Sequence, residues 1–122
     1  MYTPTKNIVK EKSEAFSIMI INVYKELTNT KKEYILSKQL LRSGTSIGAM
    51  ICESEYAESK ADFIHKFSIA QKENNETMYW LRLCLKTDYI SKTTFHHLNN
   101  EATELMKLVT KIIITSKKNL NS

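Results

Sequence analysis

Two glutamates and an arginine are the residues of this sequence whose types and spacing most suggest chemistry. Glu73 and Glu76 enclose the polar pair Asn74-Asn75 in an otherwise apolar segment. A carboxylate pair beside an arginine can serve acid–base chemistry or bind a cation, but general acid–base catalysis also needs a nucleophile and a substrate cleft. Neither is identifiable in the sequence. We favour the alternative, a partly buried network in which Arg42 pairs with the carboxylates and fixes the register of two helices.

Metal and cofactor chemistry is not predicted. A di-iron bundle needs a carboxylate-x-x-His pair on each of two helices, and only Asp62-x-x-His65 has that spacing. On a helix the adjacent His96 and His97 point about 100° apart and cannot bind one ion from the same face. The sequence has no glycine-rich phosphate loop, zinc spacing or Cys–His nucleophile signature. We therefore expect no cofactor, no metal and no enzymatic activity.

Four segments with apolar residues at every third or fourth position must hold these side chains in place. They predict an all-α fold with helices at about 7–28, 38–56, 60–87 and 92–116. Because the breaks between them are short, consecutive helices should be neighbours in an antiparallel, up-down-up-down four-helix bundle. The 122 residues form one domain in this interpretation, with no room for a second.

The helix ends are also predicted. Three serines are placed to accept hydrogen bonds from first-turn amides: Ser37, Ser59 and Ser91.

The register of the second and third helices is also predicted. With the second turn centred near Glu58, residues on these two helices lie at the same height when their numbers sum to about 116. Arg42 is then level with Asn74, between the two glutamates.

The composition is typical of a helical globular domain that does not span a membrane. Hydrophobic residues make up 42% and charged residues 25%, and only two glycines and one proline occur, which disfavours a sandwich or barrel with frequent tight turns. No apolar run approaches the roughly 20 residues of a membrane span, and no signal peptide is evident. We expect a cytoplasmic protein with no membrane contact, in which Cys52 and Cys84 are reduced and buried.

Small residues mark the middle of the second helix. Gly44, Gly48 and Cys52 recur at a spacing of four, which indicates close approach of a neighbouring backbone. Each glycine in a helix interior costs up to about 1 kcal/mol relative to alanine. A packing gain is therefore expected to offset that cost, and we favour packing over a ligand pocket.

The first and fourth helices carry more apolar side chains than the roughly 100° stripe that one core requires. An exposed apolar excess usually marks an interface, so self-association through these helices is predicted. The alternative is that four long helices enclose these positions. The expected interface residues are Ile18, Ile21, Leu105, Val109, Ile112 and Ile113.

The net charge of +5 is concentrated near both ends of the sequence. Antiparallel folding should bring four basic side chains together: Lys31, Lys32, Arg82 and Lys86. Such a cluster is a nucleic-acid footprint of low specificity, because no helix-turn-helix or aromatic-interleaved motif accompanies it. Ordinary solvated helix faces are the alternative. Trp80 is expected in core or subunit packing, since base stacking would require exposure beside basic groups.

Two sequence blocks carry a family resemblance. Residues 39–49 read QLLRSGTSIGA, with Cys52-Glu53 and SKADFI at 59–64 following. Residues 70–81 fit the pattern Ala-x-Lys-Glu-x-x-Glu-Thr-x-Tyr-Trp-Leu. With these blocks the chain resembles the four-helix bundle family named after proteins encoded in 23S ribosomal RNA intervening sequences. Met50 departs from the family, which commonly has Asn there, so any polar function of that Asn is absent or relocated.

The resemblance implies a homopentameric ring of bundles. It also implies a more distant likeness to a basic pentameric accessory protein of diversity-generating retroelements, which associates with reverse transcriptase and nucleic acid. It transfers no catalytic residue. The motif residues carry over as determinants of fold and assembly only: Arg42, Ser43, Ser46, Glu53, Glu73, Glu76 and Trp80.

We therefore predict a non-enzymatic, self-associating bundle that binds RNA or DNA, or a nucleic-acid-processing protein, through its basic surface. A structural or adaptor module that recognises only protein is the first alternative. An enzyme that uses Glu73 and Glu76 is the second.

Overall fold

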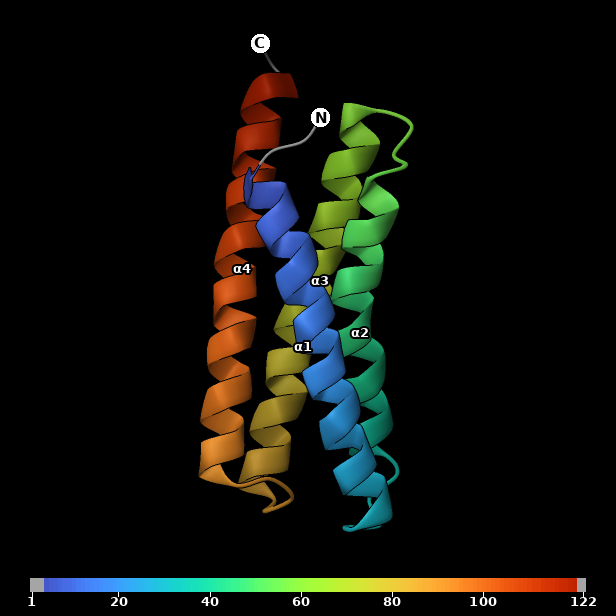
Figure 1. The fold of residues 1–122 in the computed structure, drawn as a ribbon, viewed down its shortest axis with the longest axis vertical. Coiled ribbons are helices and arrows are strands. Elements are labelled where there is room, and N and C mark those ends of the chain that lie inside the picture. The colour runs from blue at the N-terminus through green and yellow to red at the C-terminus, as the bar shows by residue number, and fades with distance from the viewer. Residues whose placement is uncertain (1–3, 121–122) are drawn as a thin grey trace.

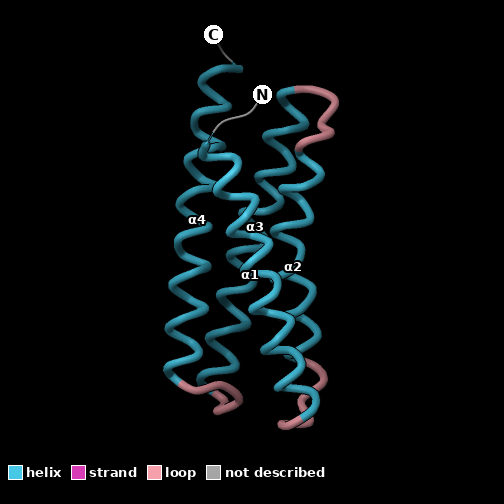
Figure 2. The backbone as a smooth tube through the Cα atoms, viewed as in Figure 1, coloured by secondary structure: helices cyan, strands magenta, loops and turns pink. Residues whose placement is uncertain are grey.

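The computed structural model describes residues 4–120, and every regular element in that range is an α-helix. The helices are α1 (Pro4–Asn29), α2 (Leu36–Ser54), α3 (Lys60–Lys86) and α4 (Lys92–Leu120). In Figure 1 each helix runs opposite to the one before it, and Figure 2 shows that only short loops join them. The predicted all-α class and the number of helices are confirmed.

The four helices enclose one hydrophobic core. Each packs against its neighbours in sequence, and α1 also contacts α4, so the arrangement closes on itself. The largest fully buried apolar side chains come from all four helices: Phe16, Ile20, Leu27, Leu40, Ile47, Phe67, Leu81, Leu98 and Leu105. Burial of each such side chain contributes about 1.5–3 kcal/mol, which makes the core the main source of stability.

The start of α2 differs from the prediction. Its cap is the carboxylate of Glu33, which accepts hydrogen bonds from the amides of Ile35, Leu36 and Ser37 at 3.1, 3.0 and 2.7 Å. The Ser37 hydroxyl instead donates to the Glu33 carbonyl at 2.8 Å. The prediction of Ser37 as the cap was therefore wrong, since a longer side chain four residues earlier reaches the same orphan amides.

The other two predicted caps are confirmed. Ser59 Oγ accepts from the amide of Asp62 at 3.0 Å, and Ser91 Oγ accepts from the amide of Thr94 at 3.1 Å. The largest shifts in helix boundary are at the chain ends, where α1 begins at Pro4 and α4 continues to Leu120. Proline is well suited to a first helical turn because its missing N–H has no intrahelical partner there.

Small residues on α2 admit α1, as predicted. A Cβ built on Gly44 would lie 2.8 Å from both Cγ atoms of Ile20, and one built on Gly48 would lie 3.3 Å from Ser17 Oγ. Cys52, placed on the same face by its spacing, is exposed, so that part of the prediction was wrong. Of the three residues, only Gly44 and Gly48 are buried.

The predicted self-association surface needs a larger correction. Four of its six residues, Leu105, Val109, Ile112 and Ile113, have at most 6% of their surface exposed and belong to the core. They were misassigned because four helices cover a wider sector of α4 than a 100° stripe. Ile18 and Ile21 on α1 remain exposed, by 56% and 36%.

Candidate functional site

The polar network predicted between α2 and α3 is present. Arg42 Nη1 donates to Glu73 Oε2 at 3.1 Å, and Arg42 Nη2 donates to Glu76 Oε2. Trp80 Nε1 donates to the same oxygen of Glu76 at 2.8 Å. The level pairing of the two helices therefore holds: one arginine on α2 joins two carboxylates one turn apart on α3.

The network is partly open to solvent. The Arg42 side chain is 48% exposed, against 19% for Glu73 and 35% for Glu76. The hydrogen bond from Trp80, followed by the contacts with Arg42, lowers the pKa of Glu76, and the Glu76 carboxylate raises the pKa of Arg42. One half-exposed arginine paired with two partly buried carboxylates can fix the register of the two helices, and its solvent exposure limits what each ion pair contributes to stability.

A second polar layer lies beneath this network. The hydroxyls of Ser43 and Thr77 are buried and 3.0 Å apart, so they join α2 to α3. Asn74 is fully buried, and neither polar atom of its side chain has a hydrogen-bond partner among the described residues. An unsatisfied buried amide costs about 1–3 kcal/mol. Asn74 is thus a polar residue enclosed within the bundle.

The remaining motif residues do not join the network. Ser46 Oγ donates to the carbonyl of Arg42 on its own helix at 2.6 Å. Glu53 is exposed, and no ion pair joins it to the network within residues 4–120. Met50 is half-buried and packs against the core.

Several observations bear on catalysis. Two surface cavities were found, one at the end of the bundle where α4 terminates and one along the side of α4. Neither Glu73 nor Glu76 lines either cavity. Burial, followed by the charge of Glu33, raises the pKa of the Cys84 thiol to about 11, so little reactive thiolate forms at neutral pH. Across residues 4–120 no three His, Cys, Asp or Glu side chains gather as metal ligands. None of the helices in that range is long and apolar enough to cross a membrane.

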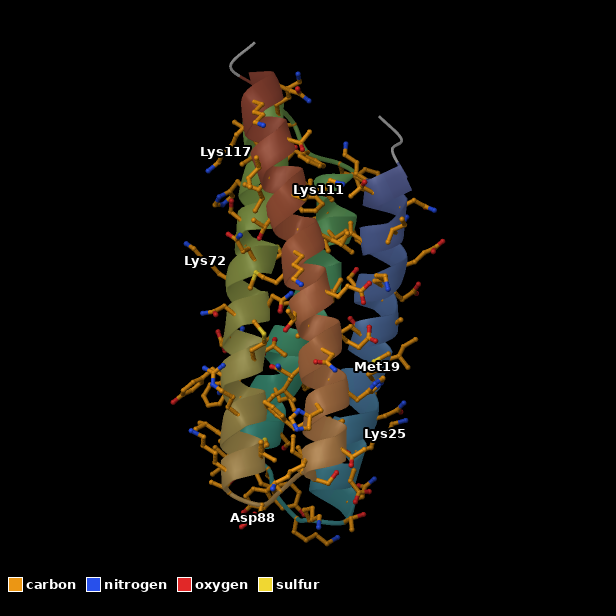
Figure 3. The ribbon with its side chains drawn as sticks, turned by 90° about the vertical axis from the view of Figure 1, so that its left-hand side faces the viewer. Met19, Lys25, Lys72, Asp88, Lys111 and Lys117 are labelled. Carbon is orange, nitrogen blue, oxygen red and sulfur yellow. The ribbon has the colours of Figure 1, made fainter. Side chains whose placement is uncertain are left out.

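The four predicted nucleic-acid contacts lie at one end of the bundle. Lys31 and Lys32 are in the loop between α1 and α2, and Arg82 and Lys86 are in the last turns of α3, at the same end in Figure 1. We call residues 25–38 and 82–92 the basic end. Figure 3 shows Lys25 and Asp88 near this end, whereas Lys111 and Lys117 lie toward the opposite one.

The basic end carries a local excess of positive charge. It holds seven basic and three acidic residues, and one of the acidic residues is Glu33, which is engaged with backbone amides. Sequence reasoning missed three of the seven basic residues: Lys25, Lys38 and Lys92. They come from three different helices, so only the closure of the bundle brings them together.

Exposed tyrosines accompany these basic side chains. Tyr34 is 59% exposed in the loop between α1 and α2, and Tyr79 is 45% exposed on α3. The guanidinium carbon of Arg82 lies 5.9 Å from the centre of the Tyr79 ring. Sequence reasoning found no aromatic interleaving because the two tyrosines are 45 residues apart in the chain. The two tyrosines could have been found from the expectation that residues of the second and third helices lie level when their numbers sum to about 116. That expectation places Tyr79 beside the start of α2.

Comparison with known proteins gives a family. The model of the 23S rRNA-intervening sequence protein family matches residues 5–111. A crystal structure at 1.70 Å of a protein of unknown function from the S23 ribosomal protein family of Bacteroides thetaiotaomicron VPI-5482 is 53% identical to this chain. The match has a TM-score of 0.88 and covers 89% of this chain and 97% of the other. Among curated proteins, none matches the chain.

Proposed function

The chain belongs to the 23S rRNA-intervening sequence protein family, and from this premise we propose that it is a non-enzymatic, self-associating antiparallel bundle that binds RNA or DNA through the basic end. The observation that carries the proposal is the gathering of seven basic residues at this end, with the exposed Tyr34 among them and the exposed Tyr79 one turn before Arg82. The family description refers to 23S rRNA, so RNA is the first ligand to test. The cytoplasm, where RNA is abundant, is the proposed location.

The chemistry of this surface fits a single-stranded or looped nucleic acid. Lysine and arginine side chains neutralise phosphates and release counterions, which makes binding weaken as salt rises. Exposed aromatic rings stack on unpaired bases and contribute about 1–3 kcal/mol per base. The basic end has both components, and because phosphate contacts and base stacking carry little sequence information, low sequence specificity is expected.

The test is a salt titration of RNA binding. Fluorescence anisotropy with a labelled single-stranded RNA should show log K falling linearly with log salt concentration. Replacing the four predicted contact residues Lys31, Lys32, Arg82 and Lys86 with Gln should weaken binding and reduce the slope by about 3, because each single-strand phosphate contact contributes about 0.7.

A matched variant at the opposite end provides the control. Replacing Lys60, Lys111, Lys117 and Lys118 with Gln removes the same charge from exposed positions outside the basic end. This variant should keep most of the slope. Equal losses in the two variants would place binding elsewhere, and no salt-dependent binding of RNA or DNA would favour the protein adaptor.

Self-association is a separate part of the proposal. It rests on Ile18 and Ile21, which are one turn apart on α1 and exposed although strongly apolar. A ring of bundles that uses this face would multiply the charge of the basic end. Light scattering should give a multiple of the 14.2 kDa subunit mass, and five subunits are expected from the family resemblance.

The contribution of α1 to self-association can be tested by comparing substitutions of two exposed isoleucines, one on α1 and one on α4. Ile18→Glu is expected to lower the assembly mass, because a carboxylate would be desolvated at the interface. Ile114→Glu alters an equally exposed isoleucine on α4, 51% against 56%, and should leave the mass unchanged. A monomeric native protein at micromolar concentration would refute self-association.

A further inference from the structure

A cavity of about 650 Å³ opens at the end of the bundle opposite the basic end. All four helices line it: the start of α1, the end of α2, the start of α3 and the end of α4. Its volume is within the range of about 300–1,000 Å³ that is typical of small-molecule sites. We call it the end cavity.

The floor of the end cavity is apolar and aromatic. Phe63 and Phe67 lie there with ring centroids 4.8 Å apart, and Ile51 and Ile112 come from α2 and α4. Phe67, Ile51 and Ile112 belong to the buried core, at 1%, 3% and 5% exposure, whereas Phe63 is only half-buried. The cavity thus reaches the hydrophobic core, where an apolar group would leave water.

The rim of the end cavity is cationic. Four lysines line it, namely Lys6, Lys10, Lys60 and Lys111, and the one acidic residue among the described lining residues is Glu55. Glu55 pairs with Lys10 at 2.8 Å. Among the described residues, the lining therefore holds three more ammonium groups than carboxylates. Lys6 Nζ already lies over the Phe63 ring, 4.4 Å from its centroid, so positive charge stands directly above the apolar floor.

From this juxtaposition we propose that the end cavity binds a small amphipathic anion, with its aliphatic or flat apolar body on the Phe63 floor and its anionic head among Lys6, Lys60 and Lys111. The floor alone would accept any apolar ligand. The charge on the rim selects an anion, because a carboxylate or phosphate gains several ammonium neighbours there and a cation would be repelled. This site is separate from the basic end and does not depend on nucleic-acid binding.

The proposal is tested with three ten-carbon probes that differ only in the head group. Calorimetry below micelle-forming concentrations compares decanoate, decyl phosphate and neutral decanol. We expect an anion to bind about tenfold more tightly than decanol, since each exposed ion pair shifts an equilibrium by up to about fivefold. Tighter binding of either decanoate or decyl phosphate than of decanol supports the proposal. The ratio of the two anion affinities shows whether the rim prefers a carboxylate or a phosphate head group.

Amino-acid substitutions distinguish the binding of the anionic head group from the binding of the apolar body of the ligand. Lys60→Gln with Lys111→Gln should abolish the preference for anions while decanol binds as before. Lys72→Gln with Lys107→Gln removes the same charge from exposed positions outside both the end cavity and the basic end, and it should leave the affinities of all three probes unchanged. Ser116→Trp, which places a ring in the cavity from a half-buried lining position on α4, should weaken all three probes.

The location can be read from NMR. Probe binding should shift the methyl signals of Ile51 and Ile112, which lie in the floor. Equal affinity for decanol and decanoate, equal effects of the two lysine pairs, or methyl shifts confined to other regions would overturn the proposal. Absence of binding to the assembled protein would also overturn it, since the cavity would then be covered or closed.

Discussion

Substitution of Gly44 by alanine tests the close approach of α1 and α2 most directly. The added Cβ would lie 2.8 Å from both Cγ1 and Cγ2 of Ile20 and 3.2 Å from its Cβ. Ile20 is fully buried and β-branched, so rotation about χ1 replaces one clashing branch with another. Relief therefore requires the two helices to separate.

The expected magnitude follows from two opposing effects. Glycine to alanine in a helix interior stabilises by about 1 kcal/mol through the unfolded state and helix propensity. Overpacking of a well-packed core costs about 1–3 kcal/mol, and contact with three atoms of a rigid stem places Gly44→Ala toward the upper part of that range. We expect a net loss of about 1–2 kcal/mol, or a melting temperature about 3–8 °C lower.

Gly48 is the matched control on the same helix face. A Cβ there would lie 3.3 Å from Ser17 Oγ and 3.4 Å from the carbonyl oxygen of Ser13. The Ser17 hydroxyl can move by a few tenths of an ångström, so the propensity gain should prevail. Gly48→Ala should be neutral or stabilise by up to about 1 kcal/mol.

Urea unfolding of both variants at two protein concentrations measures these effects and separates folding from assembly. In a double-mutant cycle, Ile20→Ala should remove most of the penalty of Gly44→Ala, because both Cγ atoms are then absent. The reasoning fails if Gly44→Ala is as stable as Gly48→Ala, or if the penalty persists unchanged in the Ile20→Ala background.

Three further predictions concern polar and loop residues. Arg42→Ala should cost about 1 kcal/mol or less in urea unfolding, and not the roughly 3 kcal/mol of an enclosed pair, because the arginine is half exposed; a loss above 2 kcal/mol would contradict the solvent screening. Lys32 has a φ of 56°, so Lys32→Gly should be about 1 kcal/mol more stable than Lys32→Ala, which removes the same charge without relieving the left-handed backbone; equal melting temperatures would exclude that strain. Burial alone would raise the pKa of Glu33, but three backbone amides lower it below its ordinary 4.5. The stabilisation from Glu33 is therefore complete above about pH 4.5 and is lost as the pH falls through its lower native value. Glu33→Gln should cost about 1–2 kcal/mol at pH 7 and flatten the acid limb of a stability–pH curve, and an unchanged limb would show that other carboxylates control it.

Local properties of the sequence determined much of this protein. Apolar spacing of three and four residues marked four helices because each must bury a stripe against its neighbours. Ser59 and Ser91 were recognisable as caps because a cap acts within one turn of the chain. Arg42 could be placed opposite Glu73 and Glu76 because a helix rises by a fixed 1.5 Å per residue.

Only the tertiary structure decided what is covered and what is open. Leu105 and Val109 on α4 could equally have faced a second subunit, and closure of the four helices placed them in the core. Ser37 had the right type for a cap, but the loop brought the Glu33 carboxylate to the amides first. Exposure, local charge and cavities depend on residues far apart in the chain that meet only after folding. The basic end and the end cavity are both of this kind, because several helix termini must meet in space before either exists.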